Sequence, residues 1–182
     1  MNRFQCYDKK IEDKHLENFI ELFKKNNMAK HEVETQWMGK MQFNSLVNGH
    51  TIIMDAPERV GGEDHGPVPK PFVLTALSGC TGMDIIAILK KANREVKDLT
   101  IKVTGELSKQ QPIEYVAMHV VYNFTGDPSC RQAALDAVTV SQEKYCGVSH
   151  MLRKALPVTW EIYYNAALEF NNRVIEKLTL EN

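Results

Sequence analysis

The sequence predicts an α+β domain in which antiparallel sheets wrap around one buried central helix. Two observations carry this prediction. An almost unbroken apolar run covers residues 71–89, and stretches in which every second residue is apolar lie on both sides of it. A period of two indicates strands, whereas an apolar run of this length favours a helix. The expected order along the chain is therefore strand, strand, helix, strand, strand, helix, strand.

The central helix is expected to begin at Pro69 and Pro71, because proline is tolerated in a first turn and breaks a helix interior. Two lysines follow the apolar run, where cations favour a helix C-terminus. Residues 72–89 are apolar all round, so we expect this helix to be buried on every side. Cys80 lies in its middle, between Gly79 and Gly82, which allow other backbone to approach closely.

The strands before and after the central helix are predicted from alternating hydrophobicity. Residues 33–43 alternate as one strand, and Asn48-Gly49 marks a hairpin whose returning strand covers 51–54. Residues 99–107 and 116–124 form a second predicted hairpin. Both hairpins fit antiparallel sheets on either side of the helix.

The last part of the chain is expected to add helices and one strand. Asp127 or Ser129 can cap a helix that carries apolar residues between 133 and 138. A short helix is predicted from Ser149, and a final strand covers 158–164.

The expected domain covers residues 31–165, with an extension at each end. The extension 1–30 contains an amphipathic helix at 11–28, and the tail 166–182 is predicted to be helical from Ala166 onward.

Composition narrows the class of protein. The 182 residues are 43% hydrophobic and 25% charged, which suits one globular domain. A net charge of −1 gives no electrostatic reason to expect nucleic acid or a membrane as a partner. The N-terminus lacks the apolar core of a signal peptide, and polar residues interrupt the central run, so we expect a cytoplasmic protein. Its four cysteines are too few for a disulfide scaffold and suit buried, catalytic or metal-binding thiols.

Cys80, in LSGCTGMD, and Cys146, in EKYCGVSHM, are the candidate chemical residues. Two thiols from distant segments are useful together when one attacks a hydroperoxide and the other captures the resulting sulfenic acid as a disulfide. The attacking thiol must be ionised, which requires nearby positive charge or helix-end dipoles. The other interpretation is a pair of buried core cysteines, which the burial habits of this residue favour. Cys6 and Cys130 are interpreted as incidental.

Four stretches together resemble the OsmC/Ohr superfamily, the osmotically inducible and organic hydroperoxide resistance proteins. They are DAPERVGGEDHGPVPK, TALSGCTGMDIIAILKK, VSQEKYCGVSHML and PVTWEIYY, and the match extends from about Trp37 to Tyr164. The resemblance implies an intertwined homodimer with two long helices at its centre. It also implies reduction of organic hydroperoxides, with Cys80 attacking, Cys146 resolving and a dithiol reductant restoring both. No cofactor and no metal is expected, since the cysteines and histidines have no recognisable zinc spacing.

The chain departs from this family in the turn before the central helix. The hydroperoxide reductases have a glutamate ten residues before the first cysteine, and this glutamate orients an arginine beside the thiolate. Lys70 occupies that position here, and residues 37–54 contain no arginine. Lys70 itself, or Arg59 or Glu63 in the preceding loop, could substitute, although a solvated loop charge is the favoured interpretation of all three.

Asp84 is the remaining supporting candidate, because it lies one turn beyond Cys80 and points to the same side of the helix. Its alternative role is a hydrogen bond to neighbouring backbone. His65 and His150 are interpreted as surface groups.

Two functions stay open at this point. The first is a thiol-dependent peroxidase, which the presence of both cysteines favours. The second is a non-catalytic module that binds a small apolar ligand or senses redox state, which the missing glutamate favours. We expect the first.

Overall fold

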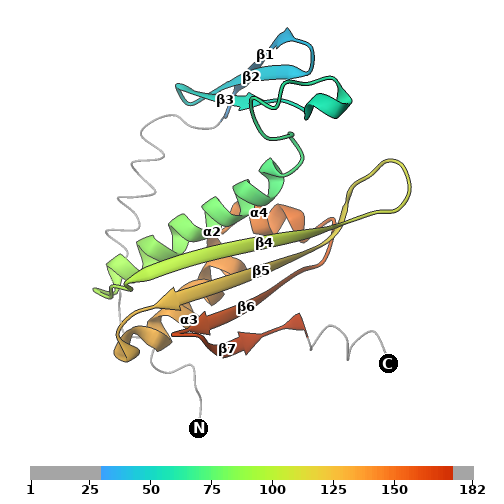
Figure 1. The fold of residues 1–182 in the computed structure, drawn as a ribbon. Coiled ribbons are helices and arrows are strands. Elements are labelled where there is room, and N and C mark those ends of the chain that lie inside the picture. Colours follow the sequence, from blue (N-terminus) through green and yellow to red (C-terminus); the bar gives the residue numbers. More distant parts are fainter. Residues whose placement is uncertain (1–29, 174–182) are drawn as a thin grey trace. The chain divides into compact units, whose positions relative to one another are not determined.

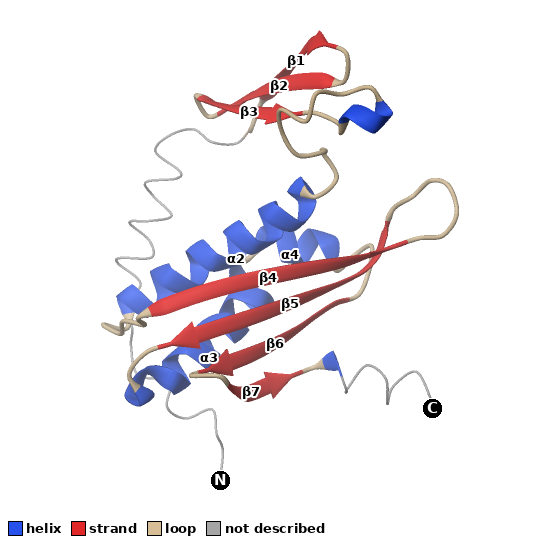
Figure 2. Cartoon of the chain, in the orientation of Figure 1, coloured by secondary structure: helices blue, strands red, loops and turns tan. Residues whose placement is uncertain are grey.

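The computed structural model describes residues 30–173 of the chain. The chain divides into two compact units, Met1–Val68 and Pro69–Asn182. Figures 1 and 2 show a small sheet in the first unit, and a larger sheet with helices on one face in the second. The helix predicted at 11–28 lies outside the described residues.

The first unit contains a three-stranded antiparallel sheet in the order β1-β2-β3. Its strands are β1 (Val33–Gly39), β2 (Gln42–Val47) and β3 (His50–Met54), followed by the short helix η1 (Glu58–Val60). The hairpin predicted at Asn48-Gly49 is confirmed, and both residues have the positive φ of a tight primed turn.

The single strand predicted at 33–43 is wrong, because two strands occupy this stretch. The chain reverses at Gly39 and Lys40, where φ is +110° and +45°. Such angles suit glycine, which has no Cβ to clash. Alternation in the sequence continues across the turn, so a period of two could not reveal it.

The second unit begins with the predicted central helix and continues with a four-stranded sheet. The helices are α2 (Phe72–Lys91), η2 (Pro128–Cys130), α3 (Arg131–Val140), η3 (Ser141–Tyr145) and α4 (Gly147–Leu152), and the strands are β4 (Asp98–Leu107), β5 (Tyr115–Thr125), β6 (Val158–Tyr164) and β7 (Ala167–Asn171). Helix α2 starts directly after Pro71, as predicted. Asp127 caps the next helical segment, since its side chain accepts a hydrogen bond from the Ser129 N–H.

The larger sheet is mixed rather than wholly antiparallel as expected. Its order is β4-β5-β6-β7, with antiparallel pairs at β4–β5 and β6–β7 and a parallel pair at β5–β6. The segment that contains α3, η3 and α4 connects β5 to β6, and a crossover of this length returns the chain in the same direction.

The helix predicted from Ala166 is wrong for its first residues, because Ala167–Asn171 form the edge strand β7. Asn165 and Ala166 both have positive φ, +49° and +67°, and turn the chain back on β6. Leu168 and Phe170 then alternate with polar residues, and the Phe170 ring stacks on Trp160 at 6.2 Å between centroids. The rest of the predicted tail helix, beyond residue 173, lies outside the described residues.

The core lies between the sheet and the helices of the second unit. Helix α2 buries one row of side chains at intervals of four residues, which places them on one face: Leu77, Thr81, Ile85 and Leu89. Alternate residues of the two central strands meet them: Met118, Val120, Tyr122, Phe124, Val158, Trp160, Ile162 and Tyr164. The core therefore holds α2 and the segment α3–α4 against the same face of the sheet.

The opposite face of α2 is apolar, and within the described part of the second unit it is exposed. Val73, Met83 and Ile86 are 38%, 72% and 37% exposed. The described residues of the second unit therefore do not bury this helix on every side, as was expected. By length and composition alone α2 could cross a membrane. Its buried row against a sheet is the packing of a core helix in a globular domain.

Candidate functional site

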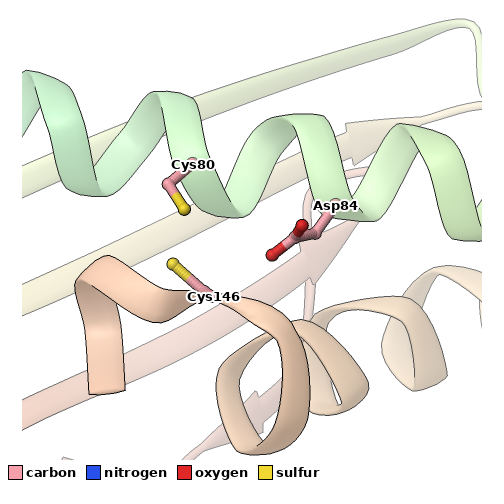
Figure 3. Close-up of side chains that lie close together, drawn as sticks. All are labelled: Cys80, Asp84 and Cys146. Carbon is pink, nitrogen blue, oxygen red and sulfur yellow. The ribbon is translucent and has the colours of Figure 1, made fainter. Parts of the chain in front are cut away.

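The second unit brings Cys80, Asp84 and Cys146 together. Cys80 and Asp84 lie one turn apart on α2, and Cys146 directly precedes α4. The two sulfurs and a carboxylate oxygen of Asp84 all lie within 4.8 Å of one another. Figure 3 shows the sulfur atoms pointing toward each other and the Asp84 carboxylate directed to the same place. The fold therefore brings the two candidate thiols close together.

A wide helical turn positions Cys146. In η3 the Cys146 N–H donates to the carbonyl of Ser141, five residues earlier, at 2.8 Å. Such single π-turns are frequent at functional sites. Cys146 is extended, with ψ of 96°, which ends the turn. Its sulfur then accepts the Ser149 N–H at 3.4 Å and caps α4. The predicted short helix therefore begins two residues earlier than Ser149, at Gly147.

The three groups of the site differ in exposure and charge. Cys146 is buried, whereas Cys80 and Asp84 are half-buried, and neither thiol forms a disulfide. Burial raises the pKa of the Cys146 thiol, and the neighbouring Cys80 and Asp84 raise it further. The Ser149 N–H acts in the opposite direction and lowers this pKa. Burial also raises the pKa of Asp84, although the Ser141 hydroxyl donates to its Oδ2 at 3.0 Å. The carboxylate is thus a better proton acceptor than an exposed aspartate.

A buried polar network joins η3 to α2 and β5 behind the site. The Thr81 hydroxyl lies 3.0 Å from the Tyr122 hydroxyl and 2.9 Å from that of Ser141. The Gln142 amide donates to Tyr122 at 2.5 Å, and its oxygen accepts the Ser149 hydroxyl at 2.6 Å. Burial raises the pKa of Tyr122 to about 12, so this hydroxyl stays protonated. The network fixes the segment that carries Cys146.

Arg153 also holds the segment that carries Cys146. Its guanidinium donates to the carbonyl of Gln142 and lies 5.9 Å from the centroid of the Trp160 ring. Sequence reasoning missed Arg153 and the whole network. The only signal was indirect: Thr81 adjoins Cys80, and Ser141 and Gln142 shortly precede Cys146.

Two of the other supporting candidates, Lys70 and Glu63, have partners of their own. Lys70 donates its ammonium to the carbonyl of Ile113, in the loop between β4 and β5. Glu63 pairs with Lys40 at 2.7 Å within the first unit, and Arg59 is an exposed residue of η1 in that unit. His65 and His150 are both exposed, as expected of surface groups.

The loop after β3 is organised by a residue that the sequence analysis did not select. Asp55 is only 3% exposed and accepts N–H groups of Ala56, Glu63 and His65 at 2.8, 3.0 and 3.2 Å. Burial alone would raise the pKa of Asp55, but these three donors outweigh it and hold the pKa below its usual value. A Cβ at Gly62 would lie 1.8 Å from the Ala56 carbonyl oxygen, so the loop also requires glycine there.

A partly open hollow lies beside the helices of the second unit. Its volume is about 340 Å³, and its lining comes from the first turn of α2, the start of β5 and the segment from the end of α4: Val73, Glu114, Tyr115, Val116, Met118, Leu152, Ala155 and Leu156. Cavities of this size accept small organic molecules.

Comparisons with known proteins identify a family profile and several similar proteins. Residues 61–161 match the family profile described as OsmC-like protein. The chain is 32% identical over 129 residues to Protein YhfA of Escherichia coli K12, covering 70% of this chain and 93% of that protein. A solved structure of a hypothetical protein from Aquifex aeolicus VF5 is 29% identical with a TM-score of 0.62, and the match covers 76% of this chain and 99% of that one.

A more distant structure shares the fold. An organic hydroperoxide resistance protein OsmC from Legionella pneumophila is 13% identical with a TM-score of 0.57. The match covers 75% of this chain and 98% of the Legionella chain. At this identity the likeness concerns the fold alone.

Proposed function

The chain belongs to the OsmC-like protein family, and from this premise we propose that it is a thiol-dependent peroxidase that reduces organic hydroperoxides. The observation that carries the proposal is the approach of two free thiols, Cys80 and Cys146, to within 4.8 Å. Most of the side chains that line the hollow of the same unit are apolar, which suits a hydroperoxide with an organic substituent.

In the first step, Asp84 takes the proton of the Cys80 thiol. The thiolate attacks the terminal oxygen of the hydroperoxide, so that an S–O bond forms while the O–O bond breaks. The alkoxide leaves and receives the proton from Asp84, which gives the alcohol. The raised pKa of Asp84 supports this role, because a carboxylate closer in basicity to a thiolate transfers protons more readily.

In the second step, Cys146 resolves the sulfenic acid on Cys80. Its sulfur attacks the Cys80 sulfur, an S–S bond forms, and the S–O bond breaks. The departing hydroxide combines with the proton of Cys146 and leaves as water. A dithiol reductant then restores both thiols and becomes a disulfide. This recycling suits a reducing cytoplasm.

We also infer that a second copy of the chain covers the exposed face of α2. Within the described residues, Val73, Met83 and Ile86 form an exposed apolar strip along α2, on the side away from the sheet. An interface that covers such a strip should bury on the order of 2,000 Å² or more, as in obligate dimers. Light scattering is expected to find a dimer, and a stable monomer at micromolar concentration contradicts this part.

The central experiment is a hydroperoxide-consumption assay with a dithiol donor, comparing cumene hydroperoxide, a lipid hydroperoxide and hydrogen peroxide. We expect the protein with the dithiol to consume organic hydroperoxides faster than the dithiol alone does.

Variants of the cysteines test the two steps. Cys80→Ser should abolish this activity. Cys146→Ser should allow one turnover and accumulate a sulfenic acid that dimedone traps. Cys130→Ala is the matched control, since Cys130 is also a buried free thiol but lies outside the cluster. A wild-type chain that adds nothing to the dithiol rate refutes the proposal.

A second candidate function is the binding of a small apolar ligand without catalysis. The cavity of about 340 Å³ favours it, as does Lys70, which stands in place of the family glutamate and bonds to Ile113 rather than to a thiolate. This function predicts that a fluorescent apolar probe binds wild type and Cys80→Ser equally. Leu156→Trp, which fills the cavity, should remove that binding.

A further inference from the structure

We propose that Cys80, Asp84 and Cys146 form a binding site for a thiophilic divalent metal ion of the zinc class. The inference goes beyond peroxide reduction and does not depend on it. Two cysteine sulfurs and one carboxylate oxygen are donors that Zn²⁺ accepts in proteins. The sequence shows no zinc motif, because 61 residues separate Asp84 from Cys146, and only the fold brings the donors together.

The spacing of the donors fits a tetrahedral ion. Zinc–sulfur bonds of about 2.3 Å place two sulfur ligands about 3.8 Å apart, and a carboxylate oxygen slightly closer to each. The three donor atoms here lie within 4.8 Å of one another. A contraction of about 1 Å between the two sulfurs, and slightly more between the oxygen and each sulfur, is therefore enough, which rotation of the side chains can supply.

The charge of the site also calls for a cation. The carboxylate of Asp84 is half-buried beside two thiols, and its hydrogen-bond partner is the neutral hydroxyl of Ser141. Within residues 30–173, none of the ion pairs includes Asp84. A partly buried carboxylate without a positive partner is costly, and a divalent ion would neutralise it together with thiolate ligands.

Outer groups already hold two of the three donors. Ser141 donates to Oδ2 of Asp84, which leaves the other oxygen free to bind an ion. The Ser149 N–H donates to the Cys146 sulfur. Both serines belong to the network with Thr81 and Gln142, and such partners orient ligands and strengthen metal binding. Three protein ligands would leave a fourth position for water or a small-molecule thiolate.

The test uses Co²⁺ as a spectroscopic substitute for Zn²⁺. The full chain, stripped with a chelator and kept reduced without oxygen, is titrated with Co²⁺. We expect one equivalent per chain, the visible bands of tetrahedral cobalt, a sulfur-to-cobalt charge-transfer band, and displacement by Zn²⁺. A Cys6→Ser/Cys130→Ala double variant should behave in the same way, because it keeps the two site cysteines.

Variants of the three ligands decide the assignment. Cys80→Ser and Cys146→Ser should weaken Co²⁺ binding by more than the 10–100-fold that is typical of outer-shell changes. Asp84→Asn should keep the charge-transfer band but weaken binding by at least about tenfold. Asp136→Asn, a partly exposed carboxylate of α3, is the control and should change nothing. Circular dichroism verifies that each variant is folded.

Two results would overturn the metal site: no Co²⁺ bound by the double variant, or equal affinity in Asp84→Asn and Asp136→Asn. Failure of this inference is separable from failure of the peroxidase. A metal-free chain that reduces hydroperoxides but binds no Co²⁺ removes the metal site alone. A chain that binds Co²⁺ through these ligands and reduces no hydroperoxide removes the peroxidase alone.

Discussion

Asp55, in the loop after β3, and Asp84, on α2, are both withdrawn from water, but their surroundings differ. Asp55 accepts three backbone N–H groups, and its pKa lies below the usual value. Asp84 accepts one hydroxyl beside two thiols, and its pKa lies above the usual value. The number of donors around the carboxylate accounts for the opposite directions.

The comparison indicates that Asp55 has a structural role, whereas Asp84 is suited to proton transfer or ion binding. Three fixed donors make ionised Asp55 the organising group of its loop, and leave it no capacity to accept a proton near neutral pH. Asp84 accepts a single hydroxyl, so binding a proton or a cation would stabilise its carboxyl group further. Perturbed groups of this second kind gather at functional sites.

The largest effect is expected from Asp84→Asn. An amide cannot accept the thiol proton, so hydroperoxide reduction should fall by about 100-fold, the low end for loss of a general base. Thermal stability should not fall, because the replaced carboxylate was disfavoured by burial. The assay is the initial rate with a dithiol donor, and Asp136→Asn should keep the wild-type rate. A full rate in Asp84→Asn would remove this residue from the proton path.

The next effect is expected from Asp55→Asn. One oxygen of the carboxylate becomes an NH₂ group that cannot accept the backbone N–H groups of the loop, so the melting temperature should fall by several degrees. Thiol reactivity of the folded protein should not change. Asp64→Asn is the matched control, since Asp64 is an exposed residue of the same loop with positive φ, which asparagine tolerates. Equal melting temperatures for the two variants would contradict the structural role of Asp55.

The pH dependence of stability should have opposite signs at the two aspartates. The pKa of Asp55 is lowered in the folded state, so its contribution is present above the unfolded value of 3.8 and is lost as pH falls through the folded pKa. The pKa of Asp84 is raised, so its contribution is fully present below 3.8 and is lost as pH rises through the folded pKa.

Denaturant unfolding at a series of pH values measures both signs. On acidification, the stability advantage of wild type over Asp55→Asn should shrink. At higher pH, as acidification passes from the raised folded pKa of Asp84 down to 3.8, wild type should gain stability relative to Asp84→Asn. If acidification changed the free energy of unfolding of wild type in the same direction relative to both variants, the two folded-state pKa values would not be shifted in opposite directions.

The smallest effect is expected from Ser141→Ala, which removes the hydroxyl that donates to Asp84. Loss of this hydrogen bond in a buried network should lower the free energy of unfolding by about 1 kcal/mol. Thr139→Ala is the control on the same helical segment, because its hydroxyl bonds only to the Leu135 carbonyl. An equal loss of unfolding free energy in both variants would mean that the hydrogen bond from Ser141 to Asp84 contributes no more than the bond from Thr139 to Leu135.

Much of the fold was predictable from the sequence because its signals are local. Pro71 before an apolar run, Asn48-Gly49 between alternating stretches, and Asp127 before a helix each act within a few residues. The errors arose where a local pattern fits two structures. Alternation continues through the turn at Gly39-Lys40, and a five-residue edge strand after Ala166 is too short to outweigh helical spacing.

The sequence by itself determined that Cys80 and Asp84 share one side of a helix, because the spacing of four residues fixes their direction. It also identified Cys146, through its resemblance to a family. Only the tertiary structure decided that Cys146 meets both of them, that Ser141 and not backbone is the partner of Asp84, and that Lys70 bonds to Ile113. These contacts join residues that lie 43 to 66 positions apart along the chain. Helical and strand periods carry no information at such separations, since the packing of α2 against the segment η3–α4 sets those distances.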